Sequence, residues 1–235
     1  MDLQGKVVLV TGGGVRIGRA ICEAFAAQGA CVVIQYRSSR KEAVALAKDL
    51  GGVAVQSGLE SEAACDGLVA SVVKTAGRLD ILVNNAAVFH KDTTASMTAS
   101  KIGQEFWPNL FVPMLLTRAF AKRVKKGAIV NLVDRRITSL DAECVPYVLA
   151  KKSLAEFTKI AALDLAPRIR VNAVAPGAVL PPPGKGQKYL HDKAGPVPLK
   201  RQVKPVEVVE AVVFLAKAES MTGQILFVDG GQGLL

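Results

Sequence analysis

The sequence predicts an α/β fold built on a parallel sheet, for two reasons. Seven short apolar runs alternate with longer segments of helical periodicity along the 235 residues, and this alternation is typical of parallel strands joined by right-handed crossovers. The runs are also too continuous for half-exposed strands, so helices should cover both faces of the sheet. We therefore expect a single Rossmann-type, doubly wound parallel sheet of about seven strands.

The strands and helices follow one another in order along the chain. Continuous apolar runs predict strands at residues 6–10, 31–36, 53–57, 79–86, 127–134, 169–175 and 224–230. Between them, helical spacing of apolar residues predicts helices at residues 17–29, 38–50, 62–76, 107–124 and 147–165. The longest irregular stretch, residues 181–200, follows the sixth strand. Loops of that length are usually lids, so we expect a substrate lid there, with a disordered surface segment as the alternative.

Composition narrows the class of protein. Half of the residues are apolar, which is enough for one sizeable core, so residues 1–235 are expected to form a single domain. No apolar stretch is long enough to cross a bilayer and the start "MDLQGK" lacks a signal-peptide pattern, which favours a soluble cytoplasmic protein with no membrane contact. Four scattered cysteines and two histidines predict neither a metal site nor a disulfide framework.

The chain is basic. Thirty Lys and Arg residues against twenty Asp and Glu give a formal net charge of +10. The basic residues are spread over the whole length, with the densest cluster at residues 122–126, and aromatic residues are few, which argues against nucleic-acid binding. A positive field would instead attract an anionic cofactor and a small-molecule substrate.

A glycine-rich turn, "TGGGVRIG" at residues 11–18, follows the first predicted strand and precedes an amphipathic helix. Backbone amides of the turn at Gly12 and of the helix start at Ile17 can face a pyrophosphate there, which the helix dipole favours. Arg16 occupies a position in this turn where a glycine is expected. The turn therefore predicts a dinucleotide site with an additional positive charge.

The end of the second strand indicates which dinucleotide is bound. An NAD-specific site has Asp or Glu there to bond the ribose 2′-hydroxyl, whereas this chain has Tyr36, Arg37, Ser38 and Ser39. A carboxylate would repel a 2′-phosphate, and this segment would bind one. Arg16 can pair with the same phosphate; the alternative is that it points into water. Together these residues predict NADPH as the cofactor.

The segment "YVLAKK" places Tyr147 and Lys151 four residues apart, and so on one face of a helix. A phenol with an ordinary pKa near ~10 is a poor acid or base at neutral pH unless a cation stabilises its phenolate. Lys151 supplies such a cation. The pair is a candidate proton donor, although the same spacing by itself is frequent on helix surfaces.

Five motifs in this order, "TGGGVRIG", "NNAA", "YVLAK", "IRVNAVAPG" and "VDGG", resemble those of the short-chain dehydrogenase/reductase family over nearly the whole chain. The resemblance implies that Tyr147 is the proton donor and that Lys151 binds the nicotinamide ribose and lowers the pKa of the phenol. It also implies that Asn109 holds a water beside the lysine. Residues expected to line the cofactor are Asn85, Ala86, Pro176, Gly177 and Val179.

The chain departs from the family pattern at the end of the fifth strand, where a serine is usual and Asp134 is present. A serine hydroxyl donates to a carbonyl oxygen that becomes an alkoxide, whereas an ionised aspartate would oppose that charge. An imine substrate suits the site better, because its product is a neutral amine and the carboxylate can orient Tyr147 or accept a substrate N–H. Gly58 is a second departure, because many members of the family have an aspartate there that bonds the adenine amino group. Leu59 could still supply a backbone carbonyl for this contact.

Within the family, the chain is similar to the pteridine reductases in the arginine of the first turn, in "YRSS" and in "VD" before the tyrosine. The similarity implies NADPH-dependent reduction of a dihydropterin or dihydrofolate, with Phe89 stacking on the pterin; the other interpretation of Phe89 is an apolar strand-end residue. Two alternatives remain: reduction of a 3-oxoacyl thioester or a quinone with Asp134 protonated, and NADPH binding without turnover. By analogy, the C-terminal "VDGGQGLL" suggests a homotetramer.

Overall fold

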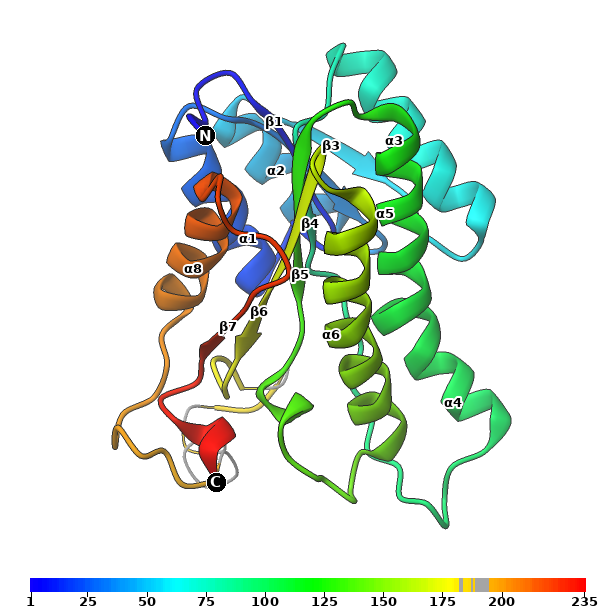
Figure 1. Ribbon diagram of the computed structural model, residues 1–235, viewed down its shortest axis with the longest axis vertical. Coiled ribbons are helices and arrows are strands. Elements are labelled where there is room, and N and C mark those ends of the chain that lie inside the picture. Colours follow the sequence, from blue (N-terminus) through cyan, green and yellow to red (C-terminus); the bar gives the residue numbers. More distant parts are fainter. Residues whose placement is uncertain (182–183, 187, 189–194) are drawn as a thin grey trace.

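Seven parallel strands form one sheet in the computed structural model, which describes residues 1–181, 184–186, 188 and 195–235. The strand order is β3-β2-β1-β4-β5-β6-β7 (Figure 1). The strands are β1 (Val7–Val10), β2 (Cys31–Tyr36), β3 (Val53–Gln56), β4 (Ile81–Asn84), β5 (Gly127–Leu132), β6 (Ile169–Pro176) and β7 (Ile225–Val228). The predicted sheet is confirmed, and each strand overlaps the apolar run that predicted it.

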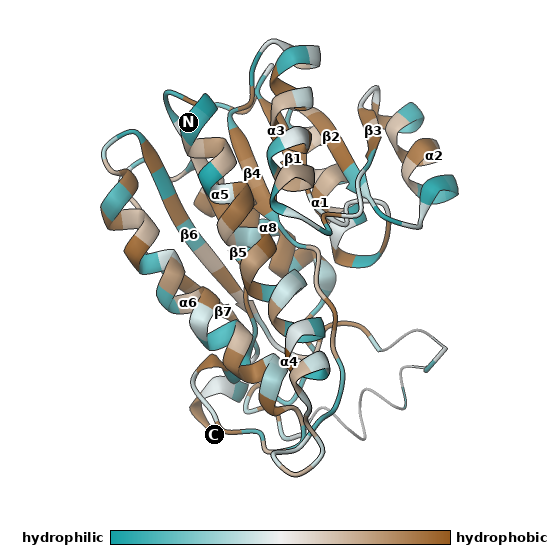
Figure 2. Cartoon of the chain, turned by 90° about the vertical axis from the view of Figure 1, so that its right-hand side faces the viewer, coloured by the Kyte–Doolittle hydropathy of each residue, from teal (hydrophilic) through white to brown (hydrophobic). Residues whose placement is uncertain are grey.

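Helices cover both faces of this sheet (Figure 2). They are α1 (Arg16–Ala27), α2 (Arg40–Leu50), α3 (Glu62–Ala76), α4 (Ala99–Phe106), α5 (Val112–Arg123), α6 (Val145–Leu165) and α8 (Pro205–Lys217). In β1, Val8 and Val10 belong to a core with α1, α2 and α8, whereas Val7 and Leu9 belong to a core with α3, α5 and α6. Both faces are apolar, so the strand appears in the sequence as a continuous apolar run.

The helix predicted at residues 107–124 is interrupted. α4 ends at Phe106, Trp107–Phe111 form a π-helical turn, and α5 begins at Val112. Pro108 lies in this turn, and a proline cannot make the regular hydrogen bond of an α-helix, which favours the wider turn. α4 and α8 were not among the predicted helices. α4 has only 8 residues and its buried residue is Glu105, so its apolar pattern is too short to indicate a helix.

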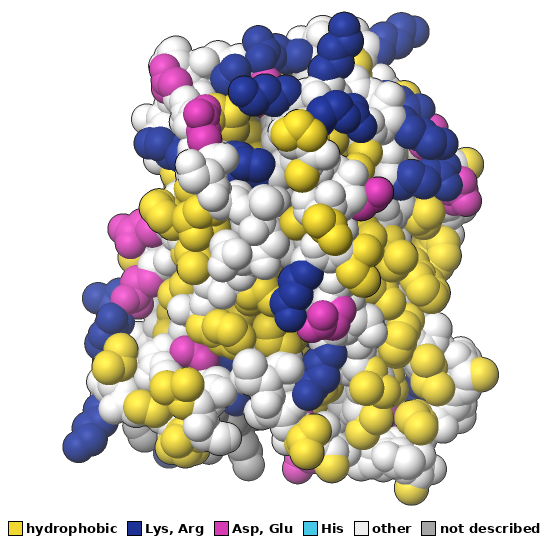
Figure 3. Space-filling view, in the orientation of Figure 1, with side chains coloured by type: hydrophobic (Ala, Val, Ile, Leu, Met, Phe, Trp, Pro, Cys, Tyr) yellow, Lys and Arg dark blue, Asp and Glu magenta, His cyan; other side chains and the backbone are white. Residues whose placement is uncertain are grey.

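Part of the basic charge lies away from the carboxyl ends of the strands. Lys and Arg side chains gather at the opposite end of the molecule (Figure 3), where α3 has Lys74 and α5 has Lys122 and Arg123 in their last turns. Cations near helix C-termini are stabilised by the helix dipole. These helix ends therefore account for a part of the positive charge.

The strand order reverses between β1 and β4, and ligands of such sheets bind beyond the carboxyl ends at this point. Thr11 joins the two strand ends, because its Oγ1 accepts the N–H groups of Asn85 and Ala86 at 2.9 and 3.0 Å. The sheet thus places the glycine-rich turn beside "NNAA", as a cofactor site between them requires.

Of the predicted lid at residues 181–200, the structure describes residues 181, 184–186, 188 and 195–200, and the rest lies outside the described residues. Its far end contacts the C-terminal segment, since the Leu199 N–H donates to the Gly230 carbonyl at 3.1 Å. Among the helices of the described ranges, none has the length and apolar character needed to cross a membrane.

Candidate active site

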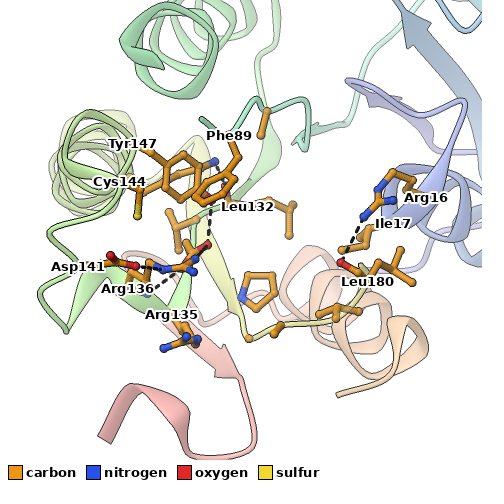
Figure 4. A pocket seen from close by; sticks show the side chains of 18 of the residues that line it. Arg16, Ile17, Phe89, Leu132, Arg135, Arg136, Asp141, Cys144, Tyr147 and Leu180 are labelled. Carbon is orange, nitrogen blue, oxygen red and sulfur yellow. Dashed lines mark hydrogen bonds and ion pairs between the residues drawn. The ribbon is translucent and has the colours of Figure 1, made fainter. Parts of the chain in front are cut away.

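A cavity of about 710 Å³ opens at the carboxyl ends of β1, β4, β5 and β6 (Figure 4). The predicted site residues that line it are Arg16, Ile17, Asn85, Phe89, Asp134, Tyr147, Lys151, Pro176, Gly177 and Val179. The predicted residues outside its lining are Gly12, Tyr36, Arg37, Ser38, Ser39, Leu59, Ala86 and Asn109. In the described part of the chain, no group of three or more His, Cys, Asp or Glu residues could hold a metal ion.

The glycine-rich turn has the shape of a phosphate site. Gly12 has a φ of +61°, which glycine adopts without strain, and a side chain at Gly18 would collide with the Gly12 carbonyl. α1 has no side-chain hydrogen bond at its N-cap, Val15, and its first residues, Arg16 and Ile17, line the cavity. The first amides of a helix lack partners within the helix and bind anions. The turn therefore fits the pyrophosphate of a dinucleotide.

Gln35 in β2 was missed by the sequence analysis. Its buried side chain accepts the Gly12 N–H at 2.9 Å and donates to the Ser57 carbonyl at 2.5 Å. It therefore joins the glycine-rich turn to the end of β3. A glutamine inside the apolar run "CVVIQY" was the available signal, because a buried amide needs hydrogen-bond partners.

The residues predicted to select NADPH lie in two segments. Arg16 has a φ of +56°, and its guanidinium donates to the carbonyls of Pro181 and Leu180 at 2.8 and 3.4 Å (Figure 4). Both bonds use Nη2, and the guanidinium has further N–H donors for a 2′-phosphate. Tyr36 is 5% exposed and packs in the core with α1 and α2. Its contribution to a cofactor site would therefore come from the backbone, whereas Ser38 is exposed before α2.

The segment after β3 has a different arrangement from the one that the family pattern suggests. The Leu59 carbonyl, predicted to face the adenine, accepts a hydrogen bond from Trp107 Nε1 at 2.8 Å. At Gly58, the Glu60 carboxylate lies where a Cβ would be. An acidic side chain two residues further along thus fills the space that an aspartate at this position would occupy.

Asp134 and Tyr147 are in direct contact. The Tyr147 hydroxyl donates to Asp134 Oδ2 at 2.9 Å. Asp134 Oδ1 accepts the Arg136 N–H at 2.9 Å, as the N-cap of the short helix η2 (Arg135–Ile137). Burial, followed by the adjacent carboxylate, raises the pKa of Tyr147 well above its ordinary value. The phenol therefore carries its proton at neutral pH and can donate it.

Lys151 is buried, and its Nζ donates to the Leu132 carbonyl at the end of β5 at 2.8 Å. The ammonium lies 6.0 Å from the centroid of the Tyr147 ring. Burial lowers the pKa of Lys151 to about 8, although Asp134 and Glu105 act in the opposite direction. A titratable cation is therefore present beside the phenol.

Asn109 lies in the π-helical turn and is fully buried. Its Nδ2 donates to the Val88 carbonyl at 3.0 Å and to Glu105 Oε2 at 2.9 Å. Glu105 Oε1 in turn contacts the backbone N–H and the Nδ1 of His90 at 2.8 and 2.6 Å, and burial raises the pKa of Glu105. The sequence analysis missed Glu105 and His90, because their contact spans two segments and leaves no spacing pattern.

Phe89 lies at the cavity with 43% of its surface exposed. Its ring meets the Tyr147 ring edge-on, with centroids 4.8 Å apart, and the Arg136 guanidinium lies 5.6 Å from its centroid (Figure 4). Arg136 also pairs with Asp134 and Asp141 at 3.3 and 2.8 Å. Arg136 and Asp141 were not among the predicted site residues.

Comparison with known proteins defines the class of this chain. A family model described as "Enoyl-(Acyl carrier protein) reductase" matches residues 14–232, which include nearly all of the sheet and the whole described lining of the cavity. The protein is accordingly an oxidoreductase with a doubly wound sheet. It belongs to the short-chain dehydrogenase/reductase family, as its motifs predicted.

Individual relatives are similar over almost their whole length. The chain is 34% identical over 257 residues to Glucose and ribitol dehydrogenase homolog 2 and 33% identical over 249 residues to NADPH-dependent aldehyde reductase 1, both from Arabidopsis thaliana; each match covers 97% of this chain and 86% of the relative. The crystal structure of FolM Alternative dihydrofolate reductase 1 from Brucella canis complexed with NADP matches with a TM-score of 0.93 and 34% identity, over 100% of this chain and 96% of that one.

Proposed function

We propose that this protein is an NADPH-dependent reductase of a dihydropterin or dihydrofolate, in which Tyr147 donates the proton during hydride transfer to a C=N bond. One observation carries the proposal: the Tyr147 hydroxyl donates to Asp134 Oδ2 at 2.9 Å. A carboxylate, which accepts hydrogen bonds, thus lies beside the proton donor. Reduction of a carbonyl would instead be helped by a hydrogen-bond donor at this place.

The charge of Asp134 distinguishes the two kinds of substrate. Reduction of C=O places negative charge on an oxygen beside the phenol, and two unit negative charges about 4 Å apart repel by about 4 kcal/mol at an effective dielectric constant of 20. In reduction of C=N, hydride adds to carbon and Tyr147 gives its proton to nitrogen, which yields a neutral amine. Asp134 can also accept an N–H of the substrate ring. The site therefore favours an imine.

The rest of the cavity suits a flat heteroaromatic ring. Phe89 exposes 43% of its surface at the cavity, and aromatic rings gain stability from offset stacking. The similarity to a Brucella canis protein described as an alternative dihydrofolate reductase supports the same substrate class. The similarity to a plant aldehyde reductase supports the carbonyl alternative.

NADPH is the cofactor in this proposal and supplies the hydride. The turn at Gly12 and the first amides of α1 would hold its pyrophosphate, as their geometry allows. Lys151 would contact the nicotinamide ribose. The NADP in the Brucella canis complex supports this cofactor. The residues proposed to bind the 2′-phosphate are Arg16, Arg37, Ser38 and Ser39, and those proposed to line the nicotinamide side are Asn85, Ala86, Pro176, Gly177 and Val179.

The test is NADPH oxidation, followed by absorbance, with dihydrobiopterin, dihydrofolate and an acetoacetyl thioester as parallel substrates and NADH as the control cofactor. We expect turnover of a pterin or folate, with preference for NADPH. Turnover of the thioester alone would reject the imine assignment and would mean that Asp134 acts as a neutral donor. Tight NADPH binding without oxidation on any substrate would reject the reductase assignment as a whole.

A further inference from the structure

Arg136 contacts three parts of the active site that come from different segments. Its Nη1 lies 3.3 Å from Asp134 Oδ2 and 3.4 Å from Oδ1, its Nε donates to Asp141 Oδ2 at 2.8 Å, and its guanidinium lies 5.6 Å from the centroid of Phe89 (Figure 4). We propose that Arg136 is a positioning residue, which orients the Asp134 carboxylate toward Tyr147 and supports the Phe89 ring. The inference rests on the proposed function.

The two oxygens of Asp134 have separate partners. Oδ1 accepts the backbone N–H of Arg136 at 2.9 Å, and Oδ2 accepts the Tyr147 hydroxyl at 2.9 Å. The backbone bond alone fixes one oxygen and leaves the carboxyl plane free to turn. A single nitrogen of the Arg136 side chain, Nη1, reaches both oxygens at 3.4 and 3.3 Å, and its charge attracts them together. Oδ2 is thereby kept directed at the phenol.

Arg136 is itself held from its other side. Asp141 accepts the Arg136 Nε–H through Oδ2 and the Glu143 N–H at 3.0 Å through Oδ1, in the segment that leads into α6. Burial lowers the pKa of Arg136, but Asp134 first, and then Cys144, Tyr147 and Asp141, raise it above its ordinary value. The side chain therefore remains a cation, and it connects the end of β5 with the start of the helix that carries Tyr147.

The charges of this cluster require a cation at this place. Asp134 and Asp141 side chains are 15% and 28% exposed, and two partly buried carboxylates near each other repel unless a positive group lies between them. Arg136, with 25% of its side chain exposed, is that group. Because the pair is partly buried, it is screened less than a surface ion pair. Loss of the guanidinium would therefore favour rotation of Asp134 away from the phenol.

The same guanidinium lies over the Phe89 ring, which also makes an edge-to-face contact with the Tyr147 ring. Phe89 is 43% exposed, so a small number of contacts decides where its ring lies. A cation over a ring face attracts it and limits its movement. A substrate ring that stacks on Phe89 would thus bind less well without Arg136.

The test compares Arg136→Gln, Arg136→Lys, Asp134→Asn and the double variant Asp134→Asn/Arg136→Gln, with whichever substrate the wild type reduces. Arg135→Gln is the matched control, because it removes the same charge from a residue of the same cavity. We expect Arg136→Gln to lower kcat/KM by about 10- to 100-fold, Arg136→Lys to lose less, and Arg135→Gln to lose clearly less than Arg136→Gln. Equal losses for Arg135→Gln and Arg136→Gln would overturn the proposal.

The double variant separates a positioning role from a purely structural one. If Arg136 acts through Asp134, Arg136→Gln costs much less activity in the Asp134→Asn background than in the wild type. The same loss in both backgrounds would overturn the proposal. Where turnover is too slow to measure, a second double-mutant cycle uses binding in place of activity. It compares the affinity of each NADP⁺-bound variant for oxidised biopterin, measured from the quenching of tryptophan fluorescence. Arg136→Gln should weaken this binding and leave NADPH affinity unchanged; unchanged biopterin affinity would overturn the role at Phe89.

The outcomes also distinguish this inference from the proposed function. Failure of the proposed function appears in the wild type, as turnover of carbonyl compounds without turnover of pterins. The double-mutant cycle between Asp134 and Arg136 can then be measured with the carbonyl substrate. The coupling between the two substitutions still tests the positioning role of Arg136. Thermal unfolding of each variant confirms that a loss of activity occurs in folded protein.

Discussion

The two halves of the active site are built in different ways. Around the glycine-rich turn, backbone groups and neutral side chains make the contacts: Gly12 bonds to Gln35, and Thr11 accepts the N–H groups of Asn85 and Ala86. Between β5 and α6, charged side chains make them, with Arg136 between Asp134 and Asp141. The first half depends mainly on shape, with Arg16 as its charged side chain, and the second depends on charge. Under the proposed function, substrate choice depends on the second half, because Asp134 stands there in place of the family's usual serine.

The largest expected effect comes from Tyr147→Phe, which removes the hydroxyl that is proposed to donate the proton between the cofactor half and the substrate half. The variant keeps the ring against Phe89 and loses the hydroxyl that donates to Asp134. We expect kcat to fall by about 10³-fold, since general acids contribute 10²- to 10⁴-fold. NADPH affinity, from fluorescence titration, should stay within about twofold because the tyrosine contributes only to the chemical step. Retention of most of the activity would remove the phenol from its role.

Asp134→Ser tests whether the second half depends on charge. Serine is also a good N-cap, so η2 should persist while the carboxylate beside Tyr147 is lost. We expect pterin or folate reduction to fall by about 100-fold, and reduction of the thioester to rise relative to it. Steady-state kinetics with both substrates measure this ratio. An unchanged preference would show that the carboxylate does not choose the substrate.

Gly18→Ala tests whether the first half depends on shape. The added methyl would meet the Gly12 carbonyl and lie 2.7 Å from Asn85 Nδ2, so the turn must shift. We expect unfolding free energy to fall by about 1–3 kcal/mol, as for other overpacked sites, and NADPH to bind more weakly. Urea unfolding and cofactor titration measure both effects.

Gly103→Ala is the matched control for this substitution. Its new methyl has no heavy atom within 4 Å, and alanine stabilises a helix interior relative to glycine by about 0.5–1 kcal/mol. The control should therefore be as stable as the wild type or more stable. Loss of NADPH affinity in both variants would mean that the turn itself is not the cause.

The smallest expected effect is a dependence of activity on the protonation of Lys151. This residue is proposed to contact the nicotinamide ribose and lies beside the Tyr147 phenol. Its pKa is lowered to about 8 by burial, so the side chain is protonated below that pH and loses its proton as the pH rises through it. We expect kcat/KM for NADPH, which reports the free enzyme, to fall over that range. Lys151→Arg has a side chain that stays charged, and its profile should lack this decrease. A limb that persists in Lys151→Arg would belong to another group.

The sequence predicted the sheet and the cofactor half better than the substrate half, because local patterns specify them. Both faces of the central strands are buried, which leaves continuous apolar runs, and Gly12 and Gly18 are required by backbone contacts within one turn. Tyr147, Lys151 and Asp134 were found through the family motifs, and the structure brings them to one cavity. Their roles, and those of the proposed cofactor contacts, stay predictions.

The remaining site features could not be predicted because they depend on contacts that follow no regular spacing in the sequence. Arg136 and Asp141 pair across a turn, and Glu105 contacts His90 15 residues away. A charged residue in such a pair has the same appearance in the sequence as one on a solvated surface. The π-helical turn was missed for a similar reason, since apolar spacing does not show one additional residue in a long helix.

That turn has a consequence for the length of the helical segment from α4 to α5. A single residue inserted in a helix rotates everything after it by about 100°, and the π-helical turn at Trp107–Phe111 accommodates such a residue without ending the helix. Asn109 can therefore be directed inward to Val88 and Glu105 while Leu116 and Phe120 of α5 still face the core. Deletion of one residue here would give a regular helix and rotate its two parts relative to each other. Either Asn109 would then turn away from Val88 and Glu105, or the apolar face of α5 would turn away from the core.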